Sequence, residues 1–229
     1  MPRAHKLMDQ LKLHEERRRD LTGLLLLAIL IGLCLGAVLA ASWYSTRPPL
    51  VLGGYEARTR SIAIVGVTKE GARAGELATL TAELRQGTGR VLLSVPPYEN
   101  EDTQRSARNA KLAAEREADL DLSHVDVVLS IESEAEMITG PSAGAAMAVV
   151  LVAVIENREV RQGAITSATI DESGRLGPVG DIDIKISAAK DAGFNLFVVS
   201  SGQTNVPKIS GIQVERAGDL SEAVNLMLW

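Results

Sequence analysis

The chain has 229 residues, a formal net charge of −5 and one cysteine. This mild acidity, with no basic stripe interleaved with aromatic residues, argues against a nucleic-acid partner. A single cysteine cannot form an internal disulfide, so cysteine usage does not report the redox compartment. The length suits one globular domain and an additional segment, and aromatic residues make up only 3% of the chain, so the core is expected to be aliphatic.

The N-terminal part has the composition of a membrane anchor. No charged residue occurs at positions 21–42, a run long enough to cross a bilayer as a helix. Basic residues concentrate before it, and Trp43 and Tyr44 follow it, which places the positive flank on the cytoplasmic side. We therefore predict a cytoplasmic basic segment at 1–20, a single-pass anchor in the lipid bilayer of the cell membrane at 21–44, and a remainder outside the cytoplasm.

A cleaved signal peptide is the alternative, because Val38-Leu39-Ala40 resembles a cleavage site. The apolar run is long for a signal peptide, which favours the uncleaved anchor. Two prolines and two glycines in residues 45–54 then predict a linker. The globular domain is expected to cover residues 55–229.

The early part of this domain is predicted to be rich in strands. Apolar residues alternate or cluster as strands require in three segments, and an alanine-rich helix with an acidic start precedes a fourth, buried strand. The strands are expected at residues 61–67, 77–84, 91–95 and 125–131, and the helix at 102–119. Glu132, Glu134 and Glu136 follow the last strand at a period of two, so they are expected to share one solvated face. The alternative is that this face borders a cleft, because it leads directly to Ser142.

Neither a nucleotide site nor a metal site is predicted. Residues 66–71 have the outer glycine spacing of a phosphate-binding loop, but the lysine and the hydroxyl residue that bind phosphate and magnesium do not follow. Asp119, Asp121 and Asp126 lack the glycine and the distal glutamate of a calcium loop, and are expected to be solvated loop carboxylates. The chain is therefore expected to use no cofactor and to contain no nucleotide-hydrolysing module.

Residues 140–156 place a serine at the start of an apolar helix. A Gly-Pro break precedes Ser142, and small and aliphatic residues continue to Glu156. The start of a helix leaves backbone N–H groups without intrahelical partners and carries the positive end of the helix dipole, so it stabilises negative charge. That environment suits an acyl-transfer nucleophile and its oxyanion. The alternative is that Ser142 only caps the helix, since serine is a preferred N-cap residue.

The later part of the domain alternates strands and helices. Strands are predicted at residues 163–170, 194–200 and 212–214, and helices at 181–193 and 220–228. Strands followed by helices, after an early part that is rich in strands, predict an α+β or mixed α/β domain.

Two residues are candidates for the base that activates Ser142. Two of the three histidines lie before the predicted anchor, across the membrane from the serine, which leaves His124. Lys185 is the other candidate, because it stands among isoleucines at a helix start, after a Gly-Pro-Val-Gly turn at 177–180. Burial would disfavour its charged form and lower its pKa. On its own, Lys185 also suits the exposed face of an amphipathic helix.

The serine motif and the lysine together resemble the proteolytic domain of the Lon proteases. Ser142, in the sequence Gly-Pro-Ser-Ala-Gly, and Lys185 stand 43 positions apart, which is the motif and the spacing of the Ser-Lys dyad of that family. Residues 102–108 and 140–147 look closest to the archaeal Lon-like serine peptidases. The resemblance covers residues 61–229.

The resemblance implies roles for the matching residues. Ser142 would be the nucleophile, and Lys185 would take its proton and return it to the leaving amine. Ser167 stands where the family has a threonine whose hydroxyl hydrogen-bonds the lysine. Thr139 replaces an aspartate of the bacterial enzymes. Backbone N–H groups around the nucleophile would stabilise the oxyanion, and this loop consists of Gly140, Pro141 and Ala143.

The expected function is that of a membrane-anchored serine endopeptidase that needs no ATP, because the motor that accompanies Lon peptidase domains has no counterpart in the sequence. Its expected substrates are unfolded or flexible polypeptides. The resemblance also implies a homo-oligomeric ring, for which six subunits are expected. Two alternatives remain: an inactive ring that binds membrane partners as a scaffold, with Ser142 only capping its helix, and a processing protease that cuts a single partner.

Overall fold

The structure is a computed structural model that describes residues 29–32, 48, 50, 58–68, 73–95, 101–133 and 140–229. The chain falls into two units, Met1–Arg47 and Pro48–Trp229. The predicted basic segment and anchor lie outside the described residues, except that residues 29–32 are helical. A search of the described residues finds no helix with the length and apolar character of a membrane span.

Most of the predicted linker also lies outside the described residues, but two of its residues contact the globular domain. The Leu50 N–H group donates a hydrogen bond to the Asp121 carbonyl (3.0 Å), and the Asp121 N–H group donates to the Pro48 carbonyl (3.0 Å). Leu50 also packs against the main hydrophobic core. This part of the segment is therefore attached to the domain.

A four-stranded sheet forms one layer of the domain. Its strands lie in the order β1-β2-β4-β3; β2 is antiparallel to both of its neighbours, and β3 is parallel to β4. The bounds are β1 Arg58–Val67, β2 Gly75–Gln86, β3 Val91–Ser94 and β4 Val125–Ser133. All four predicted strands are confirmed, and three extend beyond their predicted bounds, because pairing continues past the apolar residues that mark a strand in the sequence.

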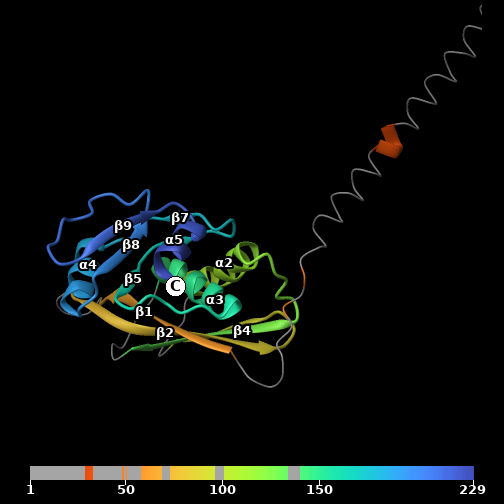
Figure 1. The fold of residues 1–229 in the computed structure, drawn as a ribbon, viewed down its shortest axis with the longest axis horizontal. Coiled ribbons are helices and arrows are strands. Elements are labelled where there is room, and N and C mark those ends of the chain that lie inside the picture. The colour runs from red at the N-terminus through yellow and green to blue at the C-terminus, as the bar shows by residue number, and fades with distance from the viewer. Residues whose placement is uncertain are drawn as a thin grey trace, which may run out of the picture. The chain divides into compact units, whose positions relative to one another are not determined.

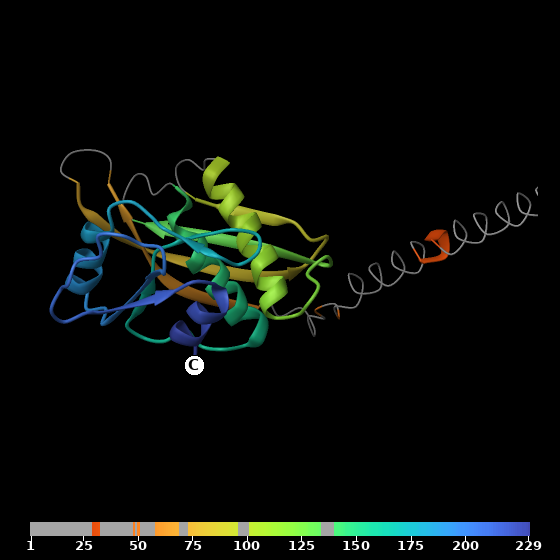
Figure 2. The ribbon, with the colours of Figure 1, turned by 90° about the horizontal axis from the view of Figure 1, so that it is seen from above.

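Three helices lie together on one face of this sheet (Figures 1 and 2). Helix α3 packs directly against β1 and β2, and α2 and α5 pack against α3. Their bounds are α2 Glu101–Glu117, α3 Gly144–Glu156 and α5 Leu220–Met227. Every residue of α3 except Glu156 is buried, because the sheet covers one side of this helix and α2 and α5 cover other sides. This burial explains why the sequence of α3 is apolar all round.

A second, smaller sheet lies beside the first core. Strands β5 Ala164–Thr166, β8 Leu196–Ser200 and β9 Gln213–Ala217 run parallel in the order β5-β8-β9. Helix α4 Ile182–Asp191 packs against β1 and β2. Ile62 and Ile64 of β1 belong to the first hydrophobic core, whereas Val65 belongs to a second core with Ile186 and Phe197. The end of β1 therefore lies where the two cores meet, and the mixed α/β class is confirmed.

The single strand predicted at residues 163–170 is wrong. The chain forms β5 and then β6 Thr169–Ile170, which pairs with β7 Leu176–Gly177 in a separate two-stranded sheet. Ser167 still donates its N–H group to the Val198 carbonyl of β8 (3.2 Å), but the Ala168 carbonyl accepts the N–H group of Ala145 in α3 (3.0 Å). The chain stops pairing with β8 after Ser167, because the next carbonyl, that of Ala168, accepts its hydrogen bond from α3 instead. These two segments are distant in sequence.

The prediction that Asp126 is a solvated carboxylate is also wrong. Asp126 is buried, and its carboxylate accepts hydrogen bonds from the Thr88 and Arg90 N–H groups (2.8 and 2.9 Å) and from the Arg90 guanidinium (2.7 Å). The guanidinium, followed by the two N–H groups, lowers the pKa of Asp126 to about 2. This carboxylate therefore holds the turn between β2 and β3 and is part of the folded framework.

Candidate catalytic site

A cavity of about 310 Å³ lies where the end of β1, the turn before α3 and the start of α4 come together. Ser142 and Lys185 both line it, as do Gly180 and Asp181. Gly66, at the end of β1, lines it too. The segment with the glycine spacing of a phosphate-binding loop therefore begins at this cavity. Residues far apart in the chain therefore meet around one small volume.

Ser142 lies in a short 3-10 helix, η1 Pro141–Ala143, directly before α3. The prediction that the helix starts at Ser142 is therefore wrong by two residues, since α3 starts at Gly144. The N-cap of η1 is Gly140 and that of α3 is Ala143, and no side chain caps either helix. The interpretation of Ser142 as an N-cap residue does not hold, and its hydroxyl remains available for another role.

The backbone around Ser142 is fixed by tight local contacts. Gly140 has a φ of +116°, a conformation that side chains disfavour, and its N–H group donates to the Thr103 hydroxyl of α2 (3.3 Å). At Gly144, an added Cβ would lie 3.1 Å from the Ile170 backbone nitrogen and 3.0 Å from its Cγ2. The start of α3 can approach β6 this closely only because residue 144 has no side chain. Thr139, immediately upstream, lies outside the described residues.

Lys185 points from α4 into the interior. Lys185 is only 5% exposed, and its Nζ donates a hydrogen bond to the Ser167 hydroxyl (3.2 Å). Ser167 is itself buried, and its hydroxyl donates to the Ser142 carbonyl (3.4 Å). The structure thus links Lys185, Ser167 and Ser142 by two hydrogen bonds in series. The reading of Lys185 as a surface residue of an amphipathic helix is wrong.

The surroundings of Lys185 bring its titration close to neutral pH. Burial lowers the pKa of its ammonium group from 10.5 to about 8, because removing a charge from water favours the neutral amine. The carboxylate of Asp181 acts in the opposite direction and raises this pKa. Asp181 lies within the same cavity and forms an ion pair with Arg73, which precedes β2. A buried lysine of this kind is partly neutral at mildly alkaline pH and can then accept a proton.

Two residues near the site escaped the sequence analysis. Arg73, from the connection between β1 and β2, lines the cavity beside Asp181. Gln203, in the loop after β8, is 7% exposed and hydrogen-bonds the backbone of Val179, in the turn before α4. Neither belongs to a recognisable motif, because each acts on a partner that is distant in the chain.

His124 is not part of the site. It is exposed in the turn that precedes β4 and does not line the cavity. The nine residues of β4 span about 30 Å. The last residue of β4, Ser133, pairs with Ala78 near the start of β2. Strand β1 finishes at this same end of the sheet, whereas His124 lies at the opposite end. The structure therefore excludes His124 as the direct base for Ser142.

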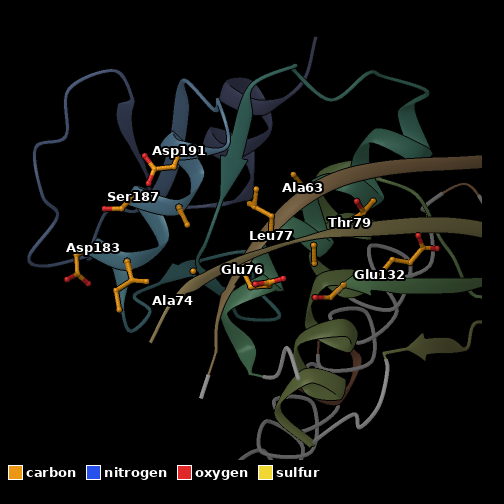
Figure 3. A pocket seen from close by; sticks show the side chains of 14 residues that line it. Ala63, Ala74, Glu76, Leu77, Thr79, Glu132, Asp183, Ser187 and Asp191 are labelled. Carbon is orange, nitrogen blue, oxygen red and sulfur yellow. The ribbon is translucent and has the colours of Figure 1, made fainter. Parts of the chain in front are cut away.

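A larger groove of about 1140 Å³ lies along α4, the start of β2 and the end of β4 (Figure 3). Figure 3 shows Asp183 and Asp191 on α4, Glu76 on β2 and Glu132 on β4. Glu132 is exposed, as predicted, and borders this groove, whereas Glu134 and Glu136 lie outside the described residues. This groove contains neither Ser142 nor Lys185, so size alone does not identify the catalytic candidate.

Residues 67–222 match the Lon protease (S16) C-terminal proteolytic domain. The chain is 27% identical to the archaeal Lon protease of Methanocaldococcus jannaschii over 131 residues, which is 55% of this chain and 20% of that protein. It is 25% identical to the archaeal Lon protease of Archaeoglobus fulgidus over 147 residues, 64% of this chain and 23% of that protein. It is also 30% identical to the DNA repair protein RadA of Synechocystis over 114 residues, 50% of this chain and 22% of that protein.

The aligned regions thus amount to 20–23% of the length of these relatives. The family match covers well over half of the chain. It includes Ser142 and Lys185, which line one cavity, and Ser167, which accepts a hydrogen bond from Lys185. The chain belongs to the family of the Lon protease C-terminal proteolytic domain, a family of serine-type peptidases.

Proposed function

We propose that this protein is a serine endopeptidase in which Ser142 is the nucleophile and Lys185 is the general base. The observation that carries the proposal is the buried hydrogen-bonded series from Lys185 Nζ through the Ser167 hydroxyl to the Ser142 carbonyl. A lysine with a pKa of about 8 is partly neutral at mildly alkaline pH, and the neutral amine is the form that can act as a base.

In the proposed acylation step, neutral Lys185 takes the proton of the Ser142 hydroxyl as its oxygen attacks the carbonyl carbon of the scissile peptide bond. The carbonyl becomes a tetrahedral oxyanion, which backbone N–H groups at the start of η1 and α3 stabilise. Collapse of this intermediate breaks the C–N bond, and the Lys185 ammonium protonates the departing amine. An ester between Ser142 and the acyl part of the substrate remains.

Deacylation repeats the same proton transfers with water. Lys185 takes a proton from a water molecule that attacks the ester carbonyl, and then returns it to the Ser142 oxygen as the carboxylic acid product leaves. Ser167 accepts a hydrogen bond from Lys185 Nζ throughout, so its role in this scheme is to aim the amine at the nucleophile. Every group in the cycle belongs to the chain, the substrate or water.

The cellular setting in this proposal derives from the sequence. The uncharged run at 21–42, with its basic flank, supports an anchor in the cell membrane and a peptidase domain outside the cytoplasm. The cavity of about 310 Å³ admits side chains and not a folded domain, which supports unfolded or flexible polypeptides as substrates. We include in the proposal that cleavage needs no ATP and that the active form is a homo-oligomeric ring.

The main competing function is an inactive ring that serves as a scaffold. That function explains Ser142 as a helix cap, but no side chain caps η1 or α3. It also gives no reason to bury Lys185, because this burial costs folding free energy and a scaffold has no use for a buried amine. A processing protease for one partner would use the same chemistry, and a single fixed product terminus would distinguish it.

Cleavage of an unfolded model protein by the full-length chain in detergent micelles, without ATP, tests the proposal. Ser142→Ala and Lys185→Ala should each abolish cleavage and labelling by a serine-reactive fluorophosphonate. The matched controls are Ser201→Ala and Lys190→Ala, at exposed positions, the second on the same helix as Lys185. Both controls should retain wild-type rates. Absence of cleavage and of labelling by the folded wild-type protein would favour the scaffold.

A further inference from the structure

We infer that Gln203 is a positioning residue, which holds Lys185 against Ser167 by fixing the turn in front of α4. This inference rests on the proposed function, because positioning matters for catalysis only if Lys185 is the base. Gln203 touches neither Ser142 nor Lys185 by a hydrogen bond, so its effect must pass through the backbone of residues 179–181.

The amide side chain of Gln203 forms a pair of hydrogen bonds with one residue. Its Oε1 accepts from the Val179 N–H group (2.8 Å), and its Nε2 donates to the Val179 carbonyl (3.0 Å) and to the Thr204 carbonyl (3.3 Å). Gln203 is 7% exposed, so water competes little for these groups. The side chain therefore satisfies both backbone groups of Val179 in the way that a neighbouring strand would.

Gln203 is itself anchored to the second sheet. Its N–H group donates to the Ser200 carbonyl at the end of β8 (3.0 Å), and its carbonyl accepts from the Arg216 guanidinium of β9 (2.8 Å). Strand β8 also receives the Ser167 N–H group at the Val198 carbonyl (3.2 Å). The same strand thus sets the position of Ser167 directly and, through Gln203, the position of the turn that leads to Lys185.

The turn needs this support because the start of α4 is weakly held by its own residues. Pro178 has no N–H group to donate. Asp181, the N-cap of α4, adopts a left-handed conformation with a φ of +57°, which costs an L-residue of order 1 kcal/mol. No side chain caps this helix start. Apart from the Arg73–Asp181 ion pair, Val179 is a point at which the rest of the fold holds the turn, and Lys185 follows within two helical turns.

Loss of the Gln203 amide would leave the Val179 N–H and carbonyl groups without partners, and water would enter to satisfy them. Water near the start of α4 would weaken the desolvation that lowers the pKa of Lys185. The charged groups around Lys185 would be unchanged, since Asp181 stays paired with Arg73, and Asp183 lines the acidic groove on another side of α4. A change in the titration of Lys185 would then report its position and hydration.

The test compares full-length wild type with Gln203→Met, which keeps the shape and removes all three hydrogen bonds of the amide, and with Gln203→Glu, which keeps the acceptor for the Val179 N–H group. Gln213→Met, at an exposed glutamine of β9, is the matched control. Three readouts are needed: the Lys185 pKa from NMR titration of isotope-labelled lysine, kcat and KM for the unfolded substrate, and thermal unfolding.

We expect Gln203→Met to lower kcat by about tenfold to a hundredfold with little change in KM, as a small misplacement of a catalytic group does. The Lys185 pKa should move upward from about 8 towards its usual value of 10.5. Gln203→Glu should fall between Gln203→Met and wild type in kcat, and Gln213→Met should match wild type in every readout. The carboxylate of Gln203→Glu would itself raise the pKa of Lys185, so the titration is compared only between Gln203→Met and wild type.

A folded Gln203→Met protein with unchanged kcat and an unchanged Lys185 titration would overturn the inference. General unfolding of both Gln203 variants would overturn it as well, because the residue would then support the whole fold and not one turn. Failure of the proposed function looks different: the wild type would not cleave, while the Lys185 pKa would still move in Gln203→Met. If Lys185→Ala abolishes cleavage and Gln203→Met changes nothing, only the role of Gln203 fails.

Discussion

Replacing Lys185 by methionine should stabilise the folded protein at neutral pH, although it removes the proposed base. The folded state holds the ammonium group in a buried site and lowers its pKa to about 8, whereas the unfolded chain has the usual value of 10.5. At about 1.4 kcal/mol per pKa unit, this difference corresponds to about 3 kcal/mol of folding free energy. Methionine has a similar length and carries no charge, so it fills the same space without that cost.

The sign of the pH dependence follows from the two pKa values. Below pH 8 the lysine is charged in both states, so the full penalty of about 3 kcal/mol applies to the wild type. Between pH 8 and 10.5 the folded amine is neutral while the unfolded one still binds a proton, so the wild-type protein gains stability as pH rises. Above this range both states are neutral and the penalty is gone. The advantage of Lys185→Met should therefore shrink across this window.

The measurement is urea unfolding of wild type and Lys185→Met at half-unit steps from pH 6.5 to 10, with Lys190→Met as the control at an exposed position of the same helix. The contributions of the titrating groups that both proteins share cancel in the difference between the two unfolding free energies. The lost hydrogen bond to Ser167 adds an offset to this difference that depends little on pH. A difference that stays constant across the range, or that grows with pH, would refute the description of Lys185 as a buried group with a lowered pKa.

Three further predictions concern the cavity and its frame. The rate of cleavage at low substrate concentration should rise with pH and level off above a midpoint near 8, because only the neutral Lys185 amine can act as a base. Arg73→Met should move this midpoint upward, since it leaves the charge of Asp181 unpaired in the cavity and Asp181 raises the pKa of Lys185. Gly75→Ala should destabilise the fold by about 1–3 kcal/mol, because its new methyl group would collide with the Ala188 side chain where β2 meets α4.

Each of these predictions has its own control. The pH–rate profile is to be compared with that of Arg85→Met, at an exposed arginine paired with Glu83, which should leave the midpoint in place. A flat profile from pH 6.5 to 9.5 would contradict the assignment of Lys185 as base, and an unshifted midpoint in Arg73→Met would contradict the coupling to Asp181. For the glycine, Gly202→Ala is the control, because an added Cβ there meets nothing within 4 Å. Equal stability of the Gly75 and Gly202 variants would contradict the collision.

Periodicity in the sequence located the secondary structure well wherever an element has one clear partner surface. Strand β2 alternates in burial along most of its length, and α3 is apolar all round because it is buried all round. The prediction failed at residues 163–170, where nothing in the sequence marks a break but the partner strand changes after Ser167. It also failed at Asp126, whose burial depends on the turn that folds over it.

The start of α3 shows a similar limit. A Gly-Pro break followed by serine and an apolar run predicted a helix with serine at its first position, and the helix was found two residues later. The chain first forms the 3-10 turn of Ser142, because the Gly140 N–H group is hydrogen-bonded to Thr103 of α2 and Gly144 packs closely against Ile170 of β6. Both constraints come from segments that are distant in sequence, so local preferences for capping could not anticipate them.

The sequence by itself determined the residue types and spacing that suggest a Ser-Lys peptidase, together with most helices and strands, because these depend on motifs and on the periodicity of apolar residues along the chain. Only the tertiary structure decided that Lys185 is buried, that Ser167 joins it to Ser142, and that Arg73 and Gln203 hold the surroundings of α4. Burial and hydrogen bonding at this site arise between elements separated by tens of residues. The pKa of the lysine, which decides whether it can act as a base, is therefore a property of the folded chain.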